Sequence, residues 1–172
     1  MLKKALLCAL ALMMASPAFA QDKNWDKRAG LRFGYGYLNG LREVEDLDSP
    51  GEAKRLSPHT FVLGFEMQQT MEGGEWLDIL FIENITISGL DQSVINPSVS
   101  VLVGFEIDKQ VQIGVGPNVS AFDPSDKGKY VHLIAAIGYT AQAGILSVPL
   151  HFSFIPDTDG YWAMALTTGV NW

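Results

Sequence analysis

Alternation of apolar and small or polar residues through segment 161–172 is the feature that most restricts the fold of this chain. One face of the segment carries Trp162, Met164, Leu166, Val170 and Trp172, with Thr168 as the exception, and the other face carries Ala163, Ala165, Thr167, Gly169 and Asn171. Because successive side chains of a strand point to opposite faces, this pattern predicts a strand with one apolar face. A strand of about 9–11 residues, tilted by roughly 45°, crosses a bilayer. The segment therefore has the length and pattern of a transmembrane β-strand.

The same two-residue period recurs through the rest of the chain. It is found at about residues 29–39, 59–69, 75–87, 97–106, 110–120, 130–141 and 145–155. The connections between these segments alternate between long (39–57, 89–96, 122–129) and short (72–74, 108–109, 142–144), and only the last, 157–160, is short where a long one is expected. Outer-membrane barrels have short turns on the periplasmic side and longer loops outside. The pattern predicts eight antiparallel strands in up-and-down order.

The composition of the second face indicates which way the apolar face points. That face carries mainly Gly, Ser, Ala, Thr and Asn, and only 18% of the whole chain is charged. A water-exposed surface normally has charged side chains at about 25–35% of its positions. An eight-stranded barrel has an interior just wide enough for side chains to fill. We therefore expect an all-β fold, a closed antiparallel eight-stranded transmembrane β-barrel whose apolar faces contact lipid and whose narrow lumen is filled.

The first twenty residues have the pattern of a secretory signal peptide. Lys3 and Lys4 precede an apolar stretch over residues 5–15, and a small-residue cleavage site ends at Ala20. We expect cleavage after Ala20, which leaves residues 21–172 as a single barrel domain. The only cysteine, Cys8, lies in the removed segment, so the mature chain is expected to have no thiol. The formal charge of −7 argues against a nucleic-acid partner.

One segment also suggests a membrane-spanning helix. Residues 133–150 contain no charged side chain and are long enough to cross a bilayer as a helix. However, they include Gly138, Gly144 and Pro149, and their apolar residues keep a two-residue period on both sides of residues 142–144. A β-hairpin accounts for both features, so we expect a hairpin.

The signal peptide, the eight amphipathic strands, the alternating connections and the aromatic C-terminal residue resemble the OmpA/OmpX-type eight-stranded outer-membrane β-barrels. The resemblance is one of pattern and covers residues 21–172. It implies a bacterial outer-membrane protein in contact with lipid and lipopolysaccharide. It also implies that the barrel-assembly machinery recognises Trp162, Met164, Leu166, Val170 and Trp172 during insertion. We expect a monomer with no cofactor and no bound metal.

Several ionisable residues fall on the inward faces of the predicted strands. Arg32 shares the interior with Glu66 and Asp78, and neighbouring strands lie about 4.8 Å apart, so Arg32 could bridge the two carboxylates. Such a cluster can act as a gate or an ion-selective constriction, or as a structural ion pair, and the structural role is favoured. Glu83 falls on the apolar face, and the sequence leaves open whether a bulge turns it inward.

His151 and Ser153 form the strongest catalytic candidate because a base and a hydroxyl nucleophile lie two residues apart on one face. Their spacing is similar to the His-x-Ser of outer-membrane lipid A deacylases, which are also eight-stranded. In that family the pair faces lipid and an asparagine follows the serine, whereas here the pair faces inward and Phe154 follows. The neighbouring segment 161–172 also offers no orienting carboxylate. A histidine held in the interior is therefore favoured over a catalytic one.

The first long connection is rich in charge. Its charged residues are Arg42, Glu43, Glu45, Asp46, Asp48, Glu52, Lys54 and Arg55. They could bind divalent cations or a partner, but no calcium-loop spacing is present, so a solvated loop is favoured.

The expected function is that of a non-catalytic outer-membrane barrel with a structural or surface-interaction role. The alternatives are a lipid-modifying outer-membrane enzyme that uses His151 and Ser153, and a soluble secreted β-barrel that binds a small ligand.

Overall fold

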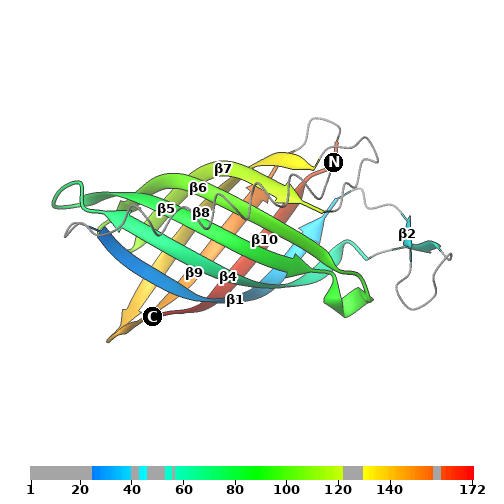
Figure 1. The fold of residues 1–172 in the computed structure, drawn as a ribbon, viewed down its shortest axis with the longest axis horizontal. Coiled ribbons are helices and arrows are strands. Elements are labelled where there is room, and N and C mark those ends of the chain that lie inside the picture. Colours follow the sequence, from blue (N-terminus) through cyan, green and yellow to red (C-terminus); the bar gives the residue numbers. More distant parts are fainter. Residues whose placement is uncertain (1–24, 40–42, 46–52, 56, 122–129, 157–159) are drawn as a thin grey trace.

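Eight long strands form a closed antiparallel barrel in the computed structural model, which describes residues 25–39, 43–45, 53–55, 57–121, 130–156 and 160–172. They are β1 (Trp25–Leu38), β4 (His59–Met71), β5 (Leu77–Ser88), β6 (Asn96–Ile107), β7 (Val111–Ser120), β8 (Val131–Ala143), β9 (Leu146–Ile155) and β10 (Ala163–Asn171). A small separate sheet pairs β2 (Glu43–Glu45) with β3 (Ala53–Arg55), and a 3-10 turn, η2, covers Leu90–Gln92. The strands tilt across the long axis of the barrel, as Figure 1 shows.

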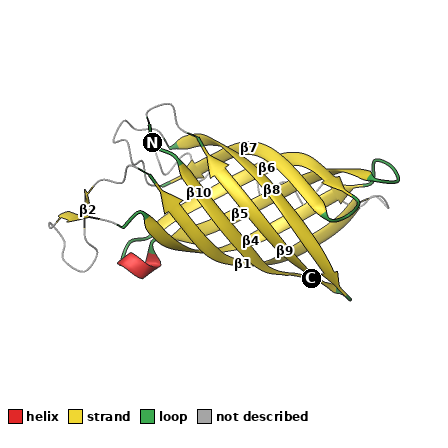
Figure 2. Ribbon diagram, turned by 180° about the vertical axis from the view of Figure 1, so that it is seen from behind, coloured by secondary structure: helices red, strands yellow, loops and turns green. Residues whose placement is uncertain are grey.

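Barrel strands that follow one another along the chain are paired, and β1 pairs with β10 to close the sheet. This order confirms the predicted up-and-down barrel. We call the end with the connections 72–76, 108–110 and 144–145 the turn end, and the opposite end the loop end. The β2–β3 sheet and η2 lie at the loop end, whereas the C-terminus lies at the turn end (Figures 1 and 2).

The expected hairpin over residues 133–150 is confirmed. β8 and β9 pair from Ala143 with Leu146 to Ala135 with Phe154. Gly144 occupies the turn with a φ of 69°, a left-handed conformation that glycine adopts without a steric penalty. Within the part of the chain that the structure describes, no helix is long and apolar enough to span a membrane.

Apolar side chains cover the outside of the barrel. Leu31, Phe105 and Leu150 are 60%, 51% and 48% exposed, whereas the polar Glu106 and Gln112 on inward faces are each 1% exposed. A soluble barrel with an apolar core has the reverse arrangement, so that alternative is wrong. An apolar belt of this extent is stable only against lipid, and closure of the sheet pairs the backbone groups that hydrocarbon cannot solvate.

Aromatic residues gather near both ends of this belt. At the turn end Trp25 lies against Phe81, with ring centroids 5.8 Å apart. At the loop end Tyr37 contacts His59 and Trp162 at centroid distances of 5.2 and 5.3 Å. Aromatic girdles of this kind mark the two water–lipid boundaries of transmembrane barrels.

The structure also answers the question that the sequence left open for Glu83. The pairing of β5 with β4 and with β6 runs without interruption, and Glu83 lies opposite Met67 and Val101. There is no bulge at this position, so Glu83 stays on the outward-facing side of β5, where its neighbours cover it and leave only 8% of it exposed.

Candidate functional site in the barrel interior

The barrel interior has two parts with different contents. Toward the turn end a network of buried polar side chains fills it; we call this network the plug, and it consists of Arg28, Arg32, Glu66, Gln68, Glu106, Gln112 and His151. Toward the loop end the interior contains a cavity of about 180 Å³. A small apolar cluster of Leu80, Ile82, Leu102 and Ile134 also faces inward.

Two Arg–Glu pairs compensate the charges of the plug. Arg32 donates a hydrogen bond to Glu66, and the guanidinium of Arg28 lies 3.3 Å from a carboxylate oxygen of Glu106. The amide Nε2 of Gln112 donates to Glu106 at 2.8 Å. Because a buried charge is tolerated only when it is paired and hydrogen-bonded, these contacts explain how the plug holds two arginine and two glutamate side chains.

His151 lies in the middle of the plug. Its Nδ1 is 3.3 Å from Oε2 of Glu66, and its Nε2 is 2.8 Å from Oε1 of Gln112. Gly138 lies opposite His151 on β8, and a Cβ at that position would collide with the imidazole ring. The absence of a side chain at Gly138 therefore provides the space that the ring occupies.

His151 and Ser153 both line the cavity but do not contact each other through a hydrogen bond among the described residues. The two ring nitrogens of His151 have partners in Glu66 and Gln112 instead. A general base must be within hydrogen-bond reach of its nucleophile. The geometry therefore does not support the His151–Ser153 pair as a catalytic unit.

Glu66 is a partner of His151 that the sequence prediction missed. The prediction searched the neighbouring strand for a carboxylate, but Glu66 belongs to β4 and reaches His151 of β9 across the lumen. No local pattern signals such a contact, because it depends on the curvature of the closed sheet.

Arg32, Glu66 and Asp78 are only partly brought together. Arg32 contacts Glu66, but Asp78 accepts a hydrogen bond from the backbone N–H of Gly73 at 3.1 Å near the turn end. Asp78 faces Glu106 in the register, and Arg28, which was not predicted as a site residue, reaches Glu106. The predicted bridge from Arg32 to Asp78 is therefore replaced by two separate pairs.

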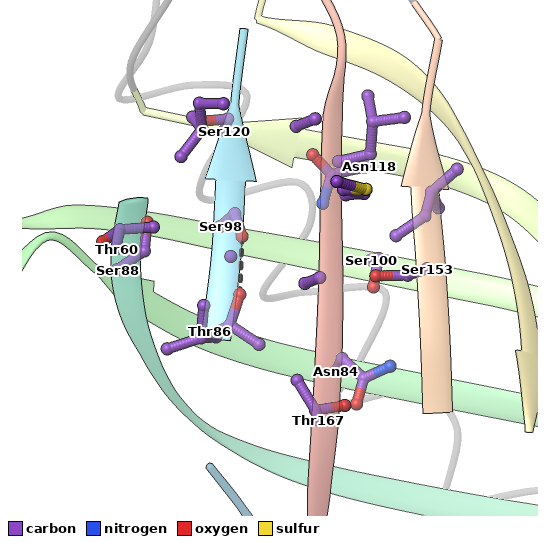
Figure 3. A pocket seen from close by; sticks show the side chains of 18 of the residues that line it. Thr60, Asn84, Thr86, Ser88, Ser98, Ser100, Asn118, Ser120, Ser153 and Thr167 are labelled. Carbon is purple, nitrogen blue, oxygen red and sulfur yellow. Dashed lines mark hydrogen bonds between the residues drawn. The ribbon is translucent and has the colours of Figure 1, made fainter. Parts of the chain in front are cut away.

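The cavity shows that the prediction of a filled lumen is wrong for the loop-end half. Most of its polar lining is small: Thr60, Asn84, Thr86, Ser88, Ser98, Ser100, Asn118, Ser120, Ser153 and Thr167 (Figure 3). These side chains are too short to meet across the barrel axis. The long side chains of the plug, in contrast, fill the turn-end half.

Some hydroxyl and amide groups of the cavity bond to one another. The hydroxyls of Thr86 and Ser98 are 2.6 Å apart, as the dashed line in Figure 3 shows. Ser120 donates to Asn96 at 3.0 Å. Arg32, Glu66 and His151, which belong to the plug, also line the cavity and form its floor.

The first long connection is described only in part. In the backbone register of the β2–β3 sheet, Glu43 lies opposite Arg55 and Glu45 lies opposite Ala53. Arg42, Asp46, Asp48 and Glu52 lie outside the described residues, as do the expected signal peptide and its cleavage site. Among the residues that the structure describes, no group of three or more His, Cys, Asp or Glu side chains could hold a metal ion.

The fold and the interior define a small transmembrane β-barrel, closed by a polar plug at the turn end and hollow at the loop end. No protein-family model and no curated protein sequence matches the chain. The structure is similar to several solved barrels of low sequence identity. One of them is the structure of the Yersinia pestis outer-membrane protein Ail in a phospholipid bilayer nanodisc. Its sequence is 14% identical to this chain, and the two structures match with a TM-score of 0.44 over 86% of this chain and 100% of that one.

The second similar structure is the crystal structure of the same attachment invasion locus protein, which is 15% identical with a TM-score of 0.46, over 85% of this chain and 97% of that one. The third comes from the de novo design of transmembrane β-barrels and is 9% identical with a TM-score of 0.39, over 88% of this chain and 98% of that one.

Proposed function

We propose that this chain is an integral outer-membrane protein of a bacterium, with a structural or surface-interaction role and no catalytic activity. The observation that carries the proposal is the apolar belt around a closed barrel, with aromatic residues near both of its ends. Outer-membrane barrels present their longer loops outside the cell. The loop end, with η2, the β2–β3 sheet and the cavity, is then the part that meets partners.

Labelling of single cysteines tests the membrane residence and the orientation together. Removal of residues 1–20 would remove Cys8, so an introduced cysteine would be the only thiol of the mature chain. Leu90→Cys lies in η2 at the loop end, and Gly74→Cys lies at the turn end, where a Cβ meets nothing within 4 Å. A membrane-impermeant maleimide applied to intact cells is expected to label Leu90→Cys and to leave Gly74→Cys unlabelled until the outer membrane is permeabilised.

The control is the recovery of both variants in the outer-membrane fraction, with the heat-modifiable gel migration of a folded barrel. Extraction of the protein by carbonate without detergent would contradict membrane residence. Labelling of Gly74→Cys alone on intact cells would show that the barrel has the opposite orientation. A size of the labelled protein that includes residues 1–20 would contradict cleavage after Ala20.

We also propose that the barrel is a monomer. It does not conduct solutes, because the plug occupies the interior at the turn end. Its partners during insertion would be outer-membrane lipid, lipopolysaccharide and the barrel-assembly machinery. Steady single-channel currents through the purified barrel in a planar bilayer would contradict the closed interior.

A lipid-modifying enzyme that uses His151 and Ser153 is the less favoured candidate. Nε2 of His151 is bonded to Gln112, and Ser153 faces the lumen, away from the lipid on which such an enzyme acts. Mass spectrometry of lipid A from cells with and without the protein is expected to give identical spectra. A mass difference that disappears in the Ser153→Ala variant would establish the enzyme instead.

A further inference from the structure

We propose that the loop-end cavity binds a small, neutral, polyhydroxylated ring, a monosaccharide or cyclic polyol, from outside the cell. The proposal goes beyond the surface role above and rests on it only for the side from which the ligand enters. The cavity reaches the loop-end termini of β1 and β10, where Asn39 and Tyr161 line it.

A row of polar side chains without partners lines one wall of the cavity. Asn84 of β5 lies opposite Ser100 of β6, which in turn lies opposite Asn118 of β7. Ser100 and Asn118 are each only 5% exposed, and for all three side chains the structure records no hydrogen-bond partner among the described residues. None of these three side chains has a fully buried polar atom without a partner, so their amides and hydroxyls open onto the cavity and are free to bond to a ligand. A ligand rich in hydroxyl groups would satisfy these groups.

The opposite wall offers further groups of the same kind. Ser153 of β9 and Thr167 of β10 line the same cavity, and neither has a hydrogen-bond partner among the residues described. An amide presents two donor hydrogens and an acceptor oxygen, and a hydroxyl both donates and accepts. A ring with hydroxyls on several carbons can therefore bond to both walls at once, whereas a linear group with one polar end cannot.

The charge of the cavity favours a neutral ligand. The charged residues that line it, Arg32 and Glu66, are paired with each other at its floor. A charged ligand would lose its hydration without gaining an unpaired counter-charge, which is unfavourable. A hydrocarbon would leave the amides of Asn84 and Asn118 without partners. Val62, Ile134 and Trp162 also line the cavity, so it suits a neutral ligand that combines hydroxyl groups with an apolar ring face.

The size of the cavity agrees with a single ring. Its volume is about 180 Å³. A cavity of about 150 Å³ in another protein admits benzene, so a six-membered ring has room here. A longer oligosaccharide would have to extend from the loop end into solvent.

The proposal is tested with the folded protein in lipid nanodiscs that contain no glycolipid, because detergents with sugar headgroups would compete. Glucose, N-acetylglucosamine and myo-inositol are the neutral probes. Glucuronate and glucosamine are charged rings of similar size, and 1-hexanol is the apolar probe. Calorimetric titration and saturation-transfer NMR are expected to show saturable one-to-one binding of at least one neutral ring and of neither the charged rings nor hexanol.

Variants locate the binding in the cavity. Asn118→Leu removes an amide but keeps the branching and the number of side-chain heavy atoms, and Ser153→Phe places a ring inside the lumen. Each is expected to weaken binding by at least about tenfold, the effect of losing one or two well-placed hydrogen bonds. Leu150→Phe makes a similar change on the outward face of the same strand, and we expect its affinity to stay within about twofold of the parent protein.

A folded barrel in nanodiscs that binds none of the neutral rings would overturn the proposal. So would preferential binding of hexanol or of a charged ring, or unchanged affinity in Asn118→Leu. If Ser153→Phe does not fold, the parent protein and Asn118→Leu still decide the outcome. Failure of the chain to insert into bilayers at all would instead contradict the proposed membrane function, so the two failures are distinguishable.

Discussion

Glu66 holds three parts of the interior together. Its side chain contacts Arg32 of β1, Gln68 of its own strand at 2.6 Å, and His151 of β9 at 3.3 Å. With an exposed fraction of 2%, it has little access to water that could replace these partners. Glu66 therefore matters to stability mainly through the charge of Arg32, which it alone neutralises among the described residues.

Glu66→Gln is expected to destabilise the folded barrel by about 3 kcal/mol, because removal of one partner leaves a buried guanidinium uncompensated. Urea unfolding in phospholipid vesicles, followed by gel mobility, measures the free energy of unfolding. The control is Glu66→Gln combined with Arg32→Met, in which no buried charge is left unpaired, and most of the lost stability should return. Equal instability of the single and double variants would contradict this explanation.

The contact between Gly138 and His151 gives a second prediction at this scale. A methyl group at Gly138 would push the imidazole away from Gln112, so Gly138→Ala should cost about 1–3 kcal/mol, as overpacking typically does. In a His151→Ala background the same change should cost much less. The two unfolding free energies, compared as a double-mutant cycle, check this. An equal cost in both backgrounds would place the cause in the backbone.

The sequence predicted one of the contacts in the barrel interior and missed others. Arg32 and Glu66 belong to neighbouring strands, so their alternation was enough to predict a contact. The contacts of His151 with Glu66 and Gln112 join strands that are not neighbours. Alternation fixes only the face on which a residue lies, and it contains no information about distances across the lumen.

At the scale of the elements, the eight barrel strands agree with the predicted segments to within a few residues. The largest difference is at β1, which begins at Trp25 because it stays paired with β4 down to Met71. Asp26, Lys27 and Arg28 interrupt the alternation of apolar residues there, so the pattern gave no sign of a strand. The β2–β3 sheet was also missed, since its strands are three residues long and carry no period.

The last strand supports a prediction about assembly. Trp172 packs against Phe65 at a centroid distance of 6.5 Å and is 60% exposed, so its loss removes little buried area. If the barrel-assembly machinery recognises this residue, Trp172→Ala should lower the amount of folded protein in the outer membrane several-fold but leave refolding into lipid vesicles nearly unchanged. Trp76→Ala, at another exposed turn-end tryptophan, is the control. Parallel losses in cells and in vitro would indicate a purely structural role.

At the scale of the whole molecule, the outward apolar belt determines where charge is tolerated. Leu150 lies near the middle of β9 and faces outward, so Leu150→Arg should destabilise the barrel in bilayers by about 2–4 kcal/mol. Ile145, which is 95% exposed at the tip of the β8–β9 turn, lies outside that depth, and Ile145→Arg should change stability by less than about 1 kcal/mol. Unfolding in vesicles measures both, and equal effects would contradict burial of the belt in lipid.

The hollow loop-end half is the whole-molecule property that the sequence did not predict. Small inward residues such as Ser100 and Ser153 are compatible with a tightly packed narrow barrel or with a cavity. The choice between them depends on the width of the closed sheet relative to side-chain length. Width is set by the number and stagger of the strands together, and no single segment contains it.

Closure of the sheet between β1 and β10 has a consequence for biosynthesis. Leu31 pairs with Val170, so the final seam joins segments from opposite ends of the described chain. No nascent fragment can complete the ring, and a partly translocated polypeptide would expose two unsatisfied edges to any neighbouring strand. The ring therefore stays open until the last strand is in place, and both edges need protection from mispairing until then.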